Sequence, residues 1–240
     1  MRQTLLALSL ALLNAASLNA AETARGVTEP FLDAVMNSPV DGIIAVVQCN
    51  EGDTVEKGTP LIELDKSLQE LEVNRRQIIL ENLRSELRRT EALFERTKGV
   101  SVEELERKRL EAREAEAEHD LARDRLDKRT IRAPFSGTVV DRLGRAPGEG
   151  LRQNESPLLR LVDTSKLRFV CRLDEPVGRE FKLGQTVNLL LGDNASKTGQ
   201  VCYVSPVVDP ASGLMTIKVL VDNADGSIRP GIAGLLELEP

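Results

Sequence analysis

The chain has 240 residues, a formal net charge of −6 at pH 7 and an aromatic content of 2%. A nucleic-acid-binding surface needs a concentration of basic residues, often with aromatic side chains that stack on the bases. The sequence has neither feature, so we expect no nucleic-acid partner.

The first 21 residues have the pattern of a secretory signal peptide. Arg2 supplies the positive charge, Leu5 to Leu13 form an apolar run, and small residues continue to Ala21. A bilayer span needs about 20 apolar residues, so this run is too short to remain as a membrane anchor. We predict that residues 1–21 are removed and that the mature protein is exported.

Two segments, residues 38–65 and 132–163, have similar sequences and predict the two halves of one β motif. In each half, Pro-x-x-Gly precedes an apolar run, a glycine-centred turn follows, and Pro-Leu-x-x-Leu closes the segment. The matching glycines are Gly42 with Gly137 and Gly52 with Gly148. An isolated β-hairpin is marginally stable in water, so we expect the two halves to pack face to face as a small sandwich.

The segment between the two halves, residues 66–131, has the composition of a helix. Half of residues 66–129 are charged, proline is absent from them, and Gly99 is their only glycine. On both sides of Gly99, apolar or small residues recur at heptad-like intervals. The first arm has Leu80, Leu83, Leu87, Thr90 and Phe94, and the second has Leu105, Ala112, Ala115, His119, Ala122 and Leu126. This pattern predicts an antiparallel coiled-coil hairpin that turns between Thr97 and Ser101.

The ends and faces of the two predicted helices carry further signals. Gly99 suits the C-terminus of the first helix, and Ser101-Val-Glu-Glu104 has the form of a capping box for the second. Ion pairs with the acid four residues before the base are expected at Glu72/Arg76, Glu103/Arg107 and Glu104/Lys108. Each arm would be about 40 Å long at about 1.5 Å per residue. A hairpin of that length is suited to reach a distant partner.

Residues 164–240 have the pattern of short strands separated by turn residues, which predicts a small antiparallel β-barrel or sandwich. The expected strands are 166–173, 186–192, 199–205, 213–221 and 233–239. Residues 22–37, which precede the first half-motif, are expected to add one more strand to this domain. The predicted fold class is therefore mainly β, with a long α-helical hairpin inserted into a split β domain.

The cysteine and histidine residues give little indication of chemistry. Cys171 and Cys202 fall in two predicted strands of the same domain and form the one candidate disulfide pair; the alternative is three buried free thiols, including Cys49. The sequence has no C-x-x-C, and its single histidine, His119, falls on the predicted helix seam. We therefore expect no metal site, no cofactor, no catalytic residues and no enzymatic activity.

The two half-motifs resemble those of the lipoyl/biotinyl domain, whose carrier members present a modified lysine on a hairpin between the halves. In this sequence the charged segment occupies that place, and Lys57 lies within the first half. The resemblance therefore implies a lipoyl-like fold, and an enzyme carrier of the lipoyl or biotinyl type is one alternative function.

The order of the segments resembles that of the periplasmic adaptor (membrane fusion) proteins of bacterial efflux systems. The phrases "SPVVDPASGLM" (205–215) and "NADGSIRPG" (223–231) are also similar to family sequences. The resemblance implies a periplasmic subunit of a multidrug or solute efflux complex, associated with the inner membrane through its transporter. The implied partners are a transporter of the resistance–nodulation–division or ABC type, an outer-membrane efflux channel, and further copies of the chain in a homo-oligomeric ring.

In the family, the hairpin tip docks onto the channel through an arginine, a leucine four residues later, and a serine across the turn. Arg89, Leu93 and Ser101 match that order, with an interval from Leu93 to Ser101 that is one residue longer than the family pattern. Family members of full length continue into a membrane-proximal domain, so we expect a short-form adaptor that ends at Pro240. A metal-ion efflux adaptor or metal-binding protein is the other alternative, which the low Met and His contents disfavour.

Overall fold

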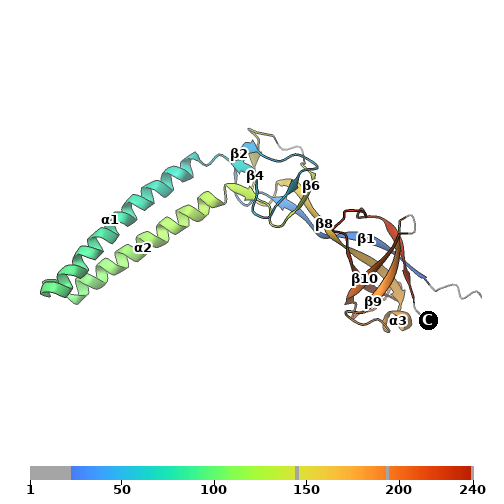
Figure 1. Ribbon diagram of the computed structural model, residues 1–240. Helices are drawn as coiled ribbons and strands as arrows, with labels where there is room; N and C mark the ends of the chain where they lie inside the picture. Colours follow the sequence, from blue (N-terminus) through green and yellow to red (C-terminus); the bar gives the residue numbers. More distant parts are fainter. Residues whose placement is uncertain (1–22, 144–145, 193–194, 239–240) are drawn as a thin grey trace, which may run out of the picture. The chain divides into compact units, whose positions relative to one another are not determined.

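The computed structural model describes residues 23–143, 146–192 and 195–238, which are mainly β with one pair of long helices (Figure 1). The predicted signal peptide, residues 1–21, lies outside the described residues. The chain divides into two compact units. One consists of residues 33–163, and the other combines the residues up to 32 with those from 164 onward. We call them the hairpin unit and the barrel unit.

The β part of the hairpin unit is built from short strands of both half-motifs. They are β2 (Gly42–Val47), β3 (Thr54–Val55), β4 (Pro60–Leu64), β5 (Thr130–Arg132), β6 (Gly137–Asp141), β7 (Gly150–Leu151) and the start of β8 (Pro157–Asp174). One sheet has the order β5-β4-β2-β7, and in the other β8, β6 and β3 are neighbours. Each sheet therefore needs strands from both half-motifs, which explains why one half is incomplete by itself.

The repeat in the sequence is matched by a repeat in the hydrogen bonds. The backbone N–H of Gly52 donates to the carbonyl of Val139 at 2.8 Å, and that of Gly148 donates to the carbonyl of Ile44 at 2.8 Å. Strand β3 pairs with β6, and β2 pairs with β7, in the same reciprocal way. Each half-motif thus joins its glycine turn to the first strand of the other half.

The core of the hairpin unit also draws on both halves. Its side chains with at most 1% exposure include Ile44, Leu61, Ile62, Leu64, Val139, Leu158, Leu159 and Leu161. Burying one such side chain is favourable by about 1.5–3 kcal/mol, so the two halves stabilise one another. This core contains residues that precede the two long helices and residues that follow them. It therefore anchors the chain where it enters and leaves the helical pair.

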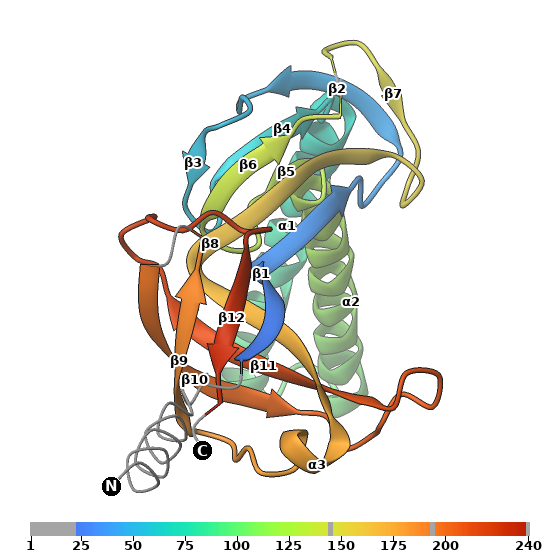
Figure 2. The same ribbon diagram turned by 90° about the vertical axis from the view of Figure 1, so that its right-hand side faces the viewer.

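The barrel unit is a closed β-barrel, which confirms the prediction of a mainly β protein with a barrel. Its strands β1 (Thr23–Asn37), β12 (Ala233–Glu237), β9 (Thr186–Leu191), β10 (Ala195–Val204), β11 (Leu214–Asp222) and β8 are neighbours in that order, and a β1–β8 pairing closes the ring. Figure 2 shows β1 and β12 side by side, with Val27 opposite Ala233. A short helix, α3 (Glu175–Gly178), follows β8.

Phe169, on β8, fills the barrel core against two glycines. Gly26 and Gly234 are directly opposite one another on β1 and β12. A Cβ atom at Gly26 would lie 2.5 Å from the ring of Phe169, and a Cβ atom at Gly234 would lie 3.2 Å from it. Protein cores are close-packed, so the missing side chains create the space that the ring occupies.

Asn223 holds the loop between β11 and β12 from the inside of the barrel unit. Its side chain is buried, and Nδ2 donates to the carbonyls of Thr164 at 2.8 Å and Ile228 at 2.9 Å. Its Oδ1 accepts from the backbone N–H of Ile228 at 2.9 Å. We expect Asn223→Ala to lower the free energy of unfolding of the barrel unit by about 2 kcal/mol, because three backbone groups lose their partner.

Urea unfolding followed by tyrosine fluorescence measures this loss. Tyr203 lies in the barrel unit and is the only tyrosine in a chain without tryptophan, so its emission reports on that unit. Asp225→Ala is the matched control, because Asp225 belongs to the same loop but is exposed and bonds Ser227 at the surface. Equal losses in the two variants would contradict the role given to Asn223.

The three cysteines are free, and they differ in exposure. Cys171 lies on β8 and Cys202 on β10, with β11 between these strands, so the two are about 10 Å apart at about 4.8 Å per strand. That separation is too large for a disulfide. The prediction of three buried thiols is wrong for Cys202, which is exposed. A β-bulge between Val201 and Tyr203 interrupts the alternation of buried and exposed residues along β10.

We expect only Cys202 to react with a chromogenic disulfide reagent in the folded protein at neutral pH. Burial raises the pKa of Cys171 to about 11 and also raises the pKa of Cys49, so both thiols stay protonated and inaccessible. Absorbance should show one thiol per chain before denaturant is added and three afterwards. A Cys202→Ser variant should lose the first reaction, whereas three fast thiols in the folded chain would overturn the expectation.

Candidate docking site at the end of the helical hairpin

Helices α1 (Ser67–Thr97) and α2 (Val102–Asp127) pack against one another as an antiparallel hairpin (Figure 1). Leu80 of α1 is buried, as are Leu105, Ala112, Ala115 and Ala122 of α2. The other residues of the predicted seam are half-buried: Leu83, Leu87, Thr90, Phe94, His119 and Leu126. Few side chains are therefore fully buried between the helices, so their alignment depends on polar contacts as well.

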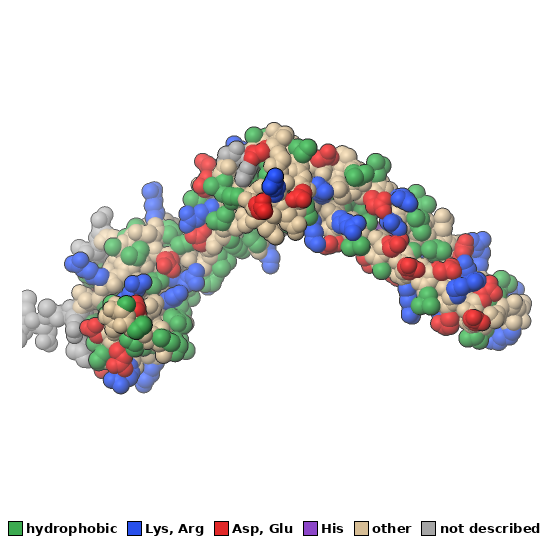
Figure 3. All heavy atoms as spheres, turned by 180° about the vertical axis from the view of Figure 1, so that it is seen from behind, with side chains coloured by type: hydrophobic (Ala, Val, Ile, Leu, Met, Phe, Trp, Pro, Cys, Tyr) green, Lys and Arg blue, Asp and Glu red, His purple; other side chains and the backbone are tan. Residues whose placement is uncertain are grey.

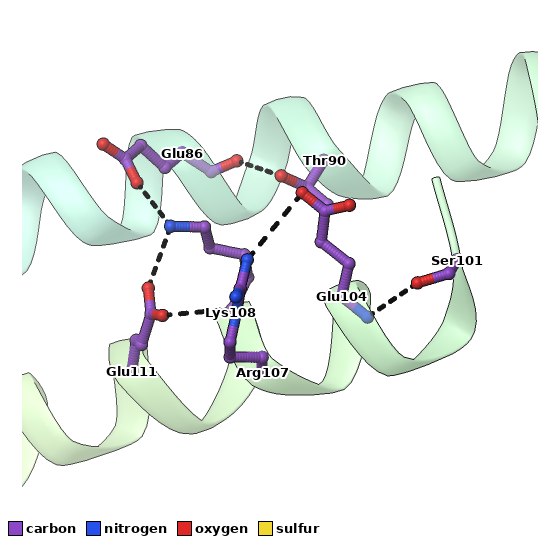
Figure 4. A network of polar contacts seen from close by, with 7 residues as sticks. All are labelled: Glu86, Thr90, Ser101, Glu104, Arg107, Lys108 and Glu111. Atoms are coloured by element: carbon purple, nitrogen blue, oxygen red, sulfur yellow. Dashed lines mark hydrogen bonds and ion pairs between the residues drawn. The ribbon is translucent and has the colours of Figure 1, made fainter. Parts of the chain in front are cut away.

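Ion pairs between the helices fix their alignment. Lys108 of α2 lies 3.0 Å from Glu86 of α1 and 2.9 Å from Glu111 of its own helix (Figure 4). Three further pairs cross between the helices: Arg76–Glu118, Arg84–Glu116 and Arg109–Glu91. The ammonium of Lys108 holds the pKa of Glu86 below its usual range. Exposed pairs contribute little stability individually, so their main effect here is to select which residues face each other.

Within the helices, the ion pairs agree with the sequence only in part. Glu72 and Arg76 are 2.8 Å apart, as predicted. Among the described residues of the two helices, the predicted pairs Glu103/Arg107 and Glu104/Lys108 do not form, and these predictions are wrong. Lys108 instead pairs with Glu86 across the seam, a contact that spacing within one helix does not reveal. Arg107 instead lies near Glu104 and Glu111 of its own helix.

The turn between the helices lies between Thr97 and Ser101, as predicted, but its left-handed residue at the end of α1 is Lys98 and not Gly99. Helix α1 ends at Thr97, and Lys98 has the left-handed backbone conformation, with φ at 53°. Its N–H donates to the carbonyl of Phe94 at 3.2 Å, and its ammonium lies 4.4 Å from the centroid of the Phe94 ring. The helix-end hydrogen bond and the cation–π contact offset the strain of a left-handed residue that is not glycine.

Ser101 caps α2, as the capping box predicted. Its Oγ accepts a hydrogen bond from the backbone N–H of Glu104 at 3.1 Å (Figure 4). In this bond the oxygen is the acceptor, so the hydroxyl proton remains available for a second hydrogen bond. Ser101 is exposed, and a partner's acceptor can therefore reach it.

Arg89 and Leu93 lie on α1, four residues apart and therefore on one face of the helix. Leu93 is 53% exposed and does not belong to the seam. Arg89 is also exposed, and its Nε donates to the carbonyl of Ser85 at 3.4 Å, near the limit for a hydrogen bond. The structure thus presents an apolar side chain and a guanidinium to solvent near the end of the hairpin.

Val102 was not singled out from the sequence. It is the first residue of α2 and is 62% exposed. Leu105 is the first buried residue of α2. A valine three residues before it, in the exposed first turn, is the sequence feature that could have identified this position. Leu93 and Val102 are the large apolar side chains most exposed within residues 89–105, one on each side of the turn.

On the face that Figure 3 shows, the hairpin carries mixed charges, with Lys and Arg beside Asp and Glu along its length. Within the described ranges, no helix combines the length and the apolar character needed to cross a membrane. Over the same residues, no three His, Cys, Asp or Glu side chains gather in a way that could hold a metal ion. Exposed apolar side chains beside a guanidinium and a hydroxyl give the hairpin end the composition of a protein-binding surface.

Comparison with proteins of known sequence finds relatives along most of the chain. Multidrug resistance protein MdtE of Escherichia coli is 25% identical over 248 residues, which cover 92% of this chain and 64% of MdtE. The solvent efflux pump periplasmic linker SrpA of Pseudomonas putida is 25% identical over 231 residues, which cover 86% of this chain and 58% of SrpA. The chain thus spans less than two thirds of the length of these relatives. No family model matches the sequence.

Solved structures share the fold. A chimera of MacA and MexA with the Pseudomonas aeruginosa MexA α-hairpin has a TM-score of 0.75 at 20% identity, covering 91% of this chain and 79% of the chimera. The membrane fusion protein Spr0693 of Streptococcus pneumoniae has a TM-score of 0.70 at 17% identity, covering 91% and 99%. In sequence the chain is therefore similar to efflux-pump periplasmic linkers, and in fold it is similar to membrane fusion proteins. The exposed hairpin end with Arg89, Leu93 and Ser101 is the candidate docking site of this chain.

Proposed function

We propose that this adaptor links an inner-membrane transporter to an outer-membrane exit duct in an efflux complex for drugs or other solutes. It acts in the periplasm after removal of residues 1–21. The β part of the hairpin unit serves as a split lipoyl-like domain around a coiled-coil hairpin, and several copies assemble into a ring. The adaptor couples and seals the complex and carries out no chemistry.

The exposure of Arg89, Leu93 and Ser101 at the end of the hairpin carries this proposal. The helices are held together by a narrow seam and by ion pairs, and they take no part in the two β cores. A helical pair of this length therefore serves to carry its end to a second protein. The names of the relatives, an efflux pump periplasmic linker and a multidrug resistance protein, support the same function.

In-cell photocrosslinking tests the proposal. A crosslinking residue at Arg96, exposed near the hairpin end, should capture an outer-membrane channel, and one at Lys182, exposed in the barrel unit, should capture an inner-membrane transporter. Arg113, exposed in the middle of α2, is the control position and should capture neither the channel nor the transporter. If Arg96 captured only other copies of this chain, the docking function would be wrong, and the hairpin would be a device for self-assembly.

A further inference from the structure

A row of basic side chains lies on the outer face of the barrel, on β8 and β11. Along β8, Lys166, Arg168 and Arg172 alternate with buried residues, among them Leu167, Phe169 and Cys171. On β11, Lys218 likewise lies between the buried Ile217 and Val219, and it is opposite Val170 of β8. The four cations therefore point outward from two adjacent strands. We call Lys166, Arg168, Lys218 and Arg172 the basic row.

The spacing within the basic row is regular. Residues two apart on a strand are separated by about 6.8 Å. Lys218 is paired with Val170, which lies between Arg168 and Arg172 on β8, so its charge lies between theirs along the strand direction. Measured along the strand direction, the row therefore has one positive charge about every 7 Å over about 20 Å, with Lys218 displaced sideways by one strand spacing of about 4.8 Å.

The cations of the basic row take part in no ion pair among the described residues of the barrel unit. The ion pairs there are Arg179–Glu175 and Lys197–Asp225, which involve other cations. The ammonium of Lys218 lies 5.5 Å from the ring centroid of Tyr203, and that of Lys166 lies 5.9 Å from the ring centroid of Phe31. Such contacts orient an ammonium group without cancelling its charge. Asp222 is opposite Lys166 in the strand register and is the acidic residue at that end of the row; at the other end, the charge of Arg172 contributes to lowering the pKa of Asp209.

Arg168 adds an independent observation. Its Nε is the one buried side-chain nitrogen or oxygen among the described residues without a hydrogen-bond partner. Its Nη2 reaches only the carbonyl of Pro30, at 3.4 Å. A buried donor without an acceptor is costly and rare in native proteins. Arg168 as a residue is half-buried, so an external acceptor can approach its guanidinium only from the exposed side and not at the buried Nε.

We infer that the basic row binds an extended acidic segment of a partner protein. Carboxylates on alternate residues of an extended peptide are also about 6.8 Å apart and so match the cations one to one. A shallow groove at one end of the row offers room for the peptide backbone; its lining includes Lys166, Thr198, Gln200 and Leu220, together with the acidic Asp222, beside which the peptide would place an uncharged residue. A membrane surface fits less well, because the apolar residues between the cations, Val170 and Leu220, are half-buried and do not protrude. This inference is independent of the docking function proposed for the hairpin.

Fluorescence anisotropy with a synthetic peptide tests the inference on the purified full chain. The probe is a labelled peptide of about eight residues with alternating Glu and Thr, matched by a Gln-Thr peptide, at low ionic strength. We expect the Glu-Thr peptide to bind, added salt to weaken it, and the Lys166→Gln/Lys218→Gln variant to bind it about tenfold more weakly. Arg168→Met should also weaken binding with little change in the melting temperature, because the variant removes an unpaired Nε and only one long internal hydrogen bond, from Nη2 to the carbonyl of Pro30.

A matched control removes the same charge elsewhere on the barrel unit. Lys182 and Arg229 are both exposed, so Lys182→Gln/Arg229→Gln should change the peptide affinity less than about twofold. Equal weakening in the two double variants would overturn the inference by showing non-specific attraction. Binding of phosphatidylglycerol vesicles without binding of the peptide would also overturn it, in favour of a lipid surface. None of these outcomes bears on docking by the hairpin, which these variants leave unchanged.

Discussion

Phe169→Ala will lower the free energy of unfolding of the barrel unit by about 4 kcal/mol. The ring is fully buried, and it lies against Gly26 and Gly234, which have no side chains to fill the space that truncation leaves. These glycines are paired across β1 and β12, so the backbone around the cavity is held by the closed ring of strands. The cavity therefore stays open, and the lost ring contacts are not replaced.

Two spectroscopic signals assign this effect to one unit. Tyr203 fluorescence follows the barrel unit, and far-ultraviolet circular dichroism is dominated by the long helices of the hairpin unit. Phe135→Ala is the control, because Phe135 packs against the core of the hairpin unit and should change the second signal alone. A loss of less than about 1 kcal/mol in the tyrosine transition of Phe169→Ala would show that the barrel collapses onto the glycines.

The barrel could be predicted from the sequence because apolar and polar residues alternate within each strand. The expected strand at 166–173 falls within β8, where Leu167, Phe169 and Cys171 are buried on one face. The contact of Phe169 with Gly26 and Gly234 could not be predicted, since it joins three strands that are far apart in the sequence. Cys202 was placed wrongly for a related reason, because a bulge depends on how β10 pairs with β11.

The hairpin shows the same limit. Its seam and the cap at Ser101 could be predicted, because both depend on the order of residues within one helix. The left-handed Lys98 and the contact of Lys108 with Glu86 depend on how two helices meet at a turn, and sequence spacing assigned neither. For the docking site, the sequence supplied Arg89, Leu93 and Ser101 through a family resemblance, and the structure adds that all three are exposed.

Arg89→Glu combined with Leu93→Asp will reduce crosslinking from Arg96 to the outer-membrane channel at least about tenfold, if the hairpin end docks as proposed. The first change reverses the charge that would meet partner carbonyls or carboxylates, and the second replaces the exposed apolar contact by a carboxylate. Both side chains are outside the seam, so the helices should keep their packing. Unchanged circular dichroism would establish that the loss comes from docking.

Matched variants separate the docking site from the general charge of the hairpin. Arg88→Glu with Leu110→Asp makes the same changes at two exposed positions of the helices and should leave the crosslink intact. Ser101 requires a different design, because Ser101→Ala removes the helix cap, at a cost of about 1 kcal/mol, together with the hydroxyl. Ser101→Asn retains a cap but removes the hydroxyl donor, so a weaker crosslink in this variant would assign a docking role to Ser101 itself. If the Arg88/Leu110 variant failed as completely as the Arg89/Leu93 variant, the contact would depend on the overall charge of the hairpin, and no single face of α1 would be the docking site.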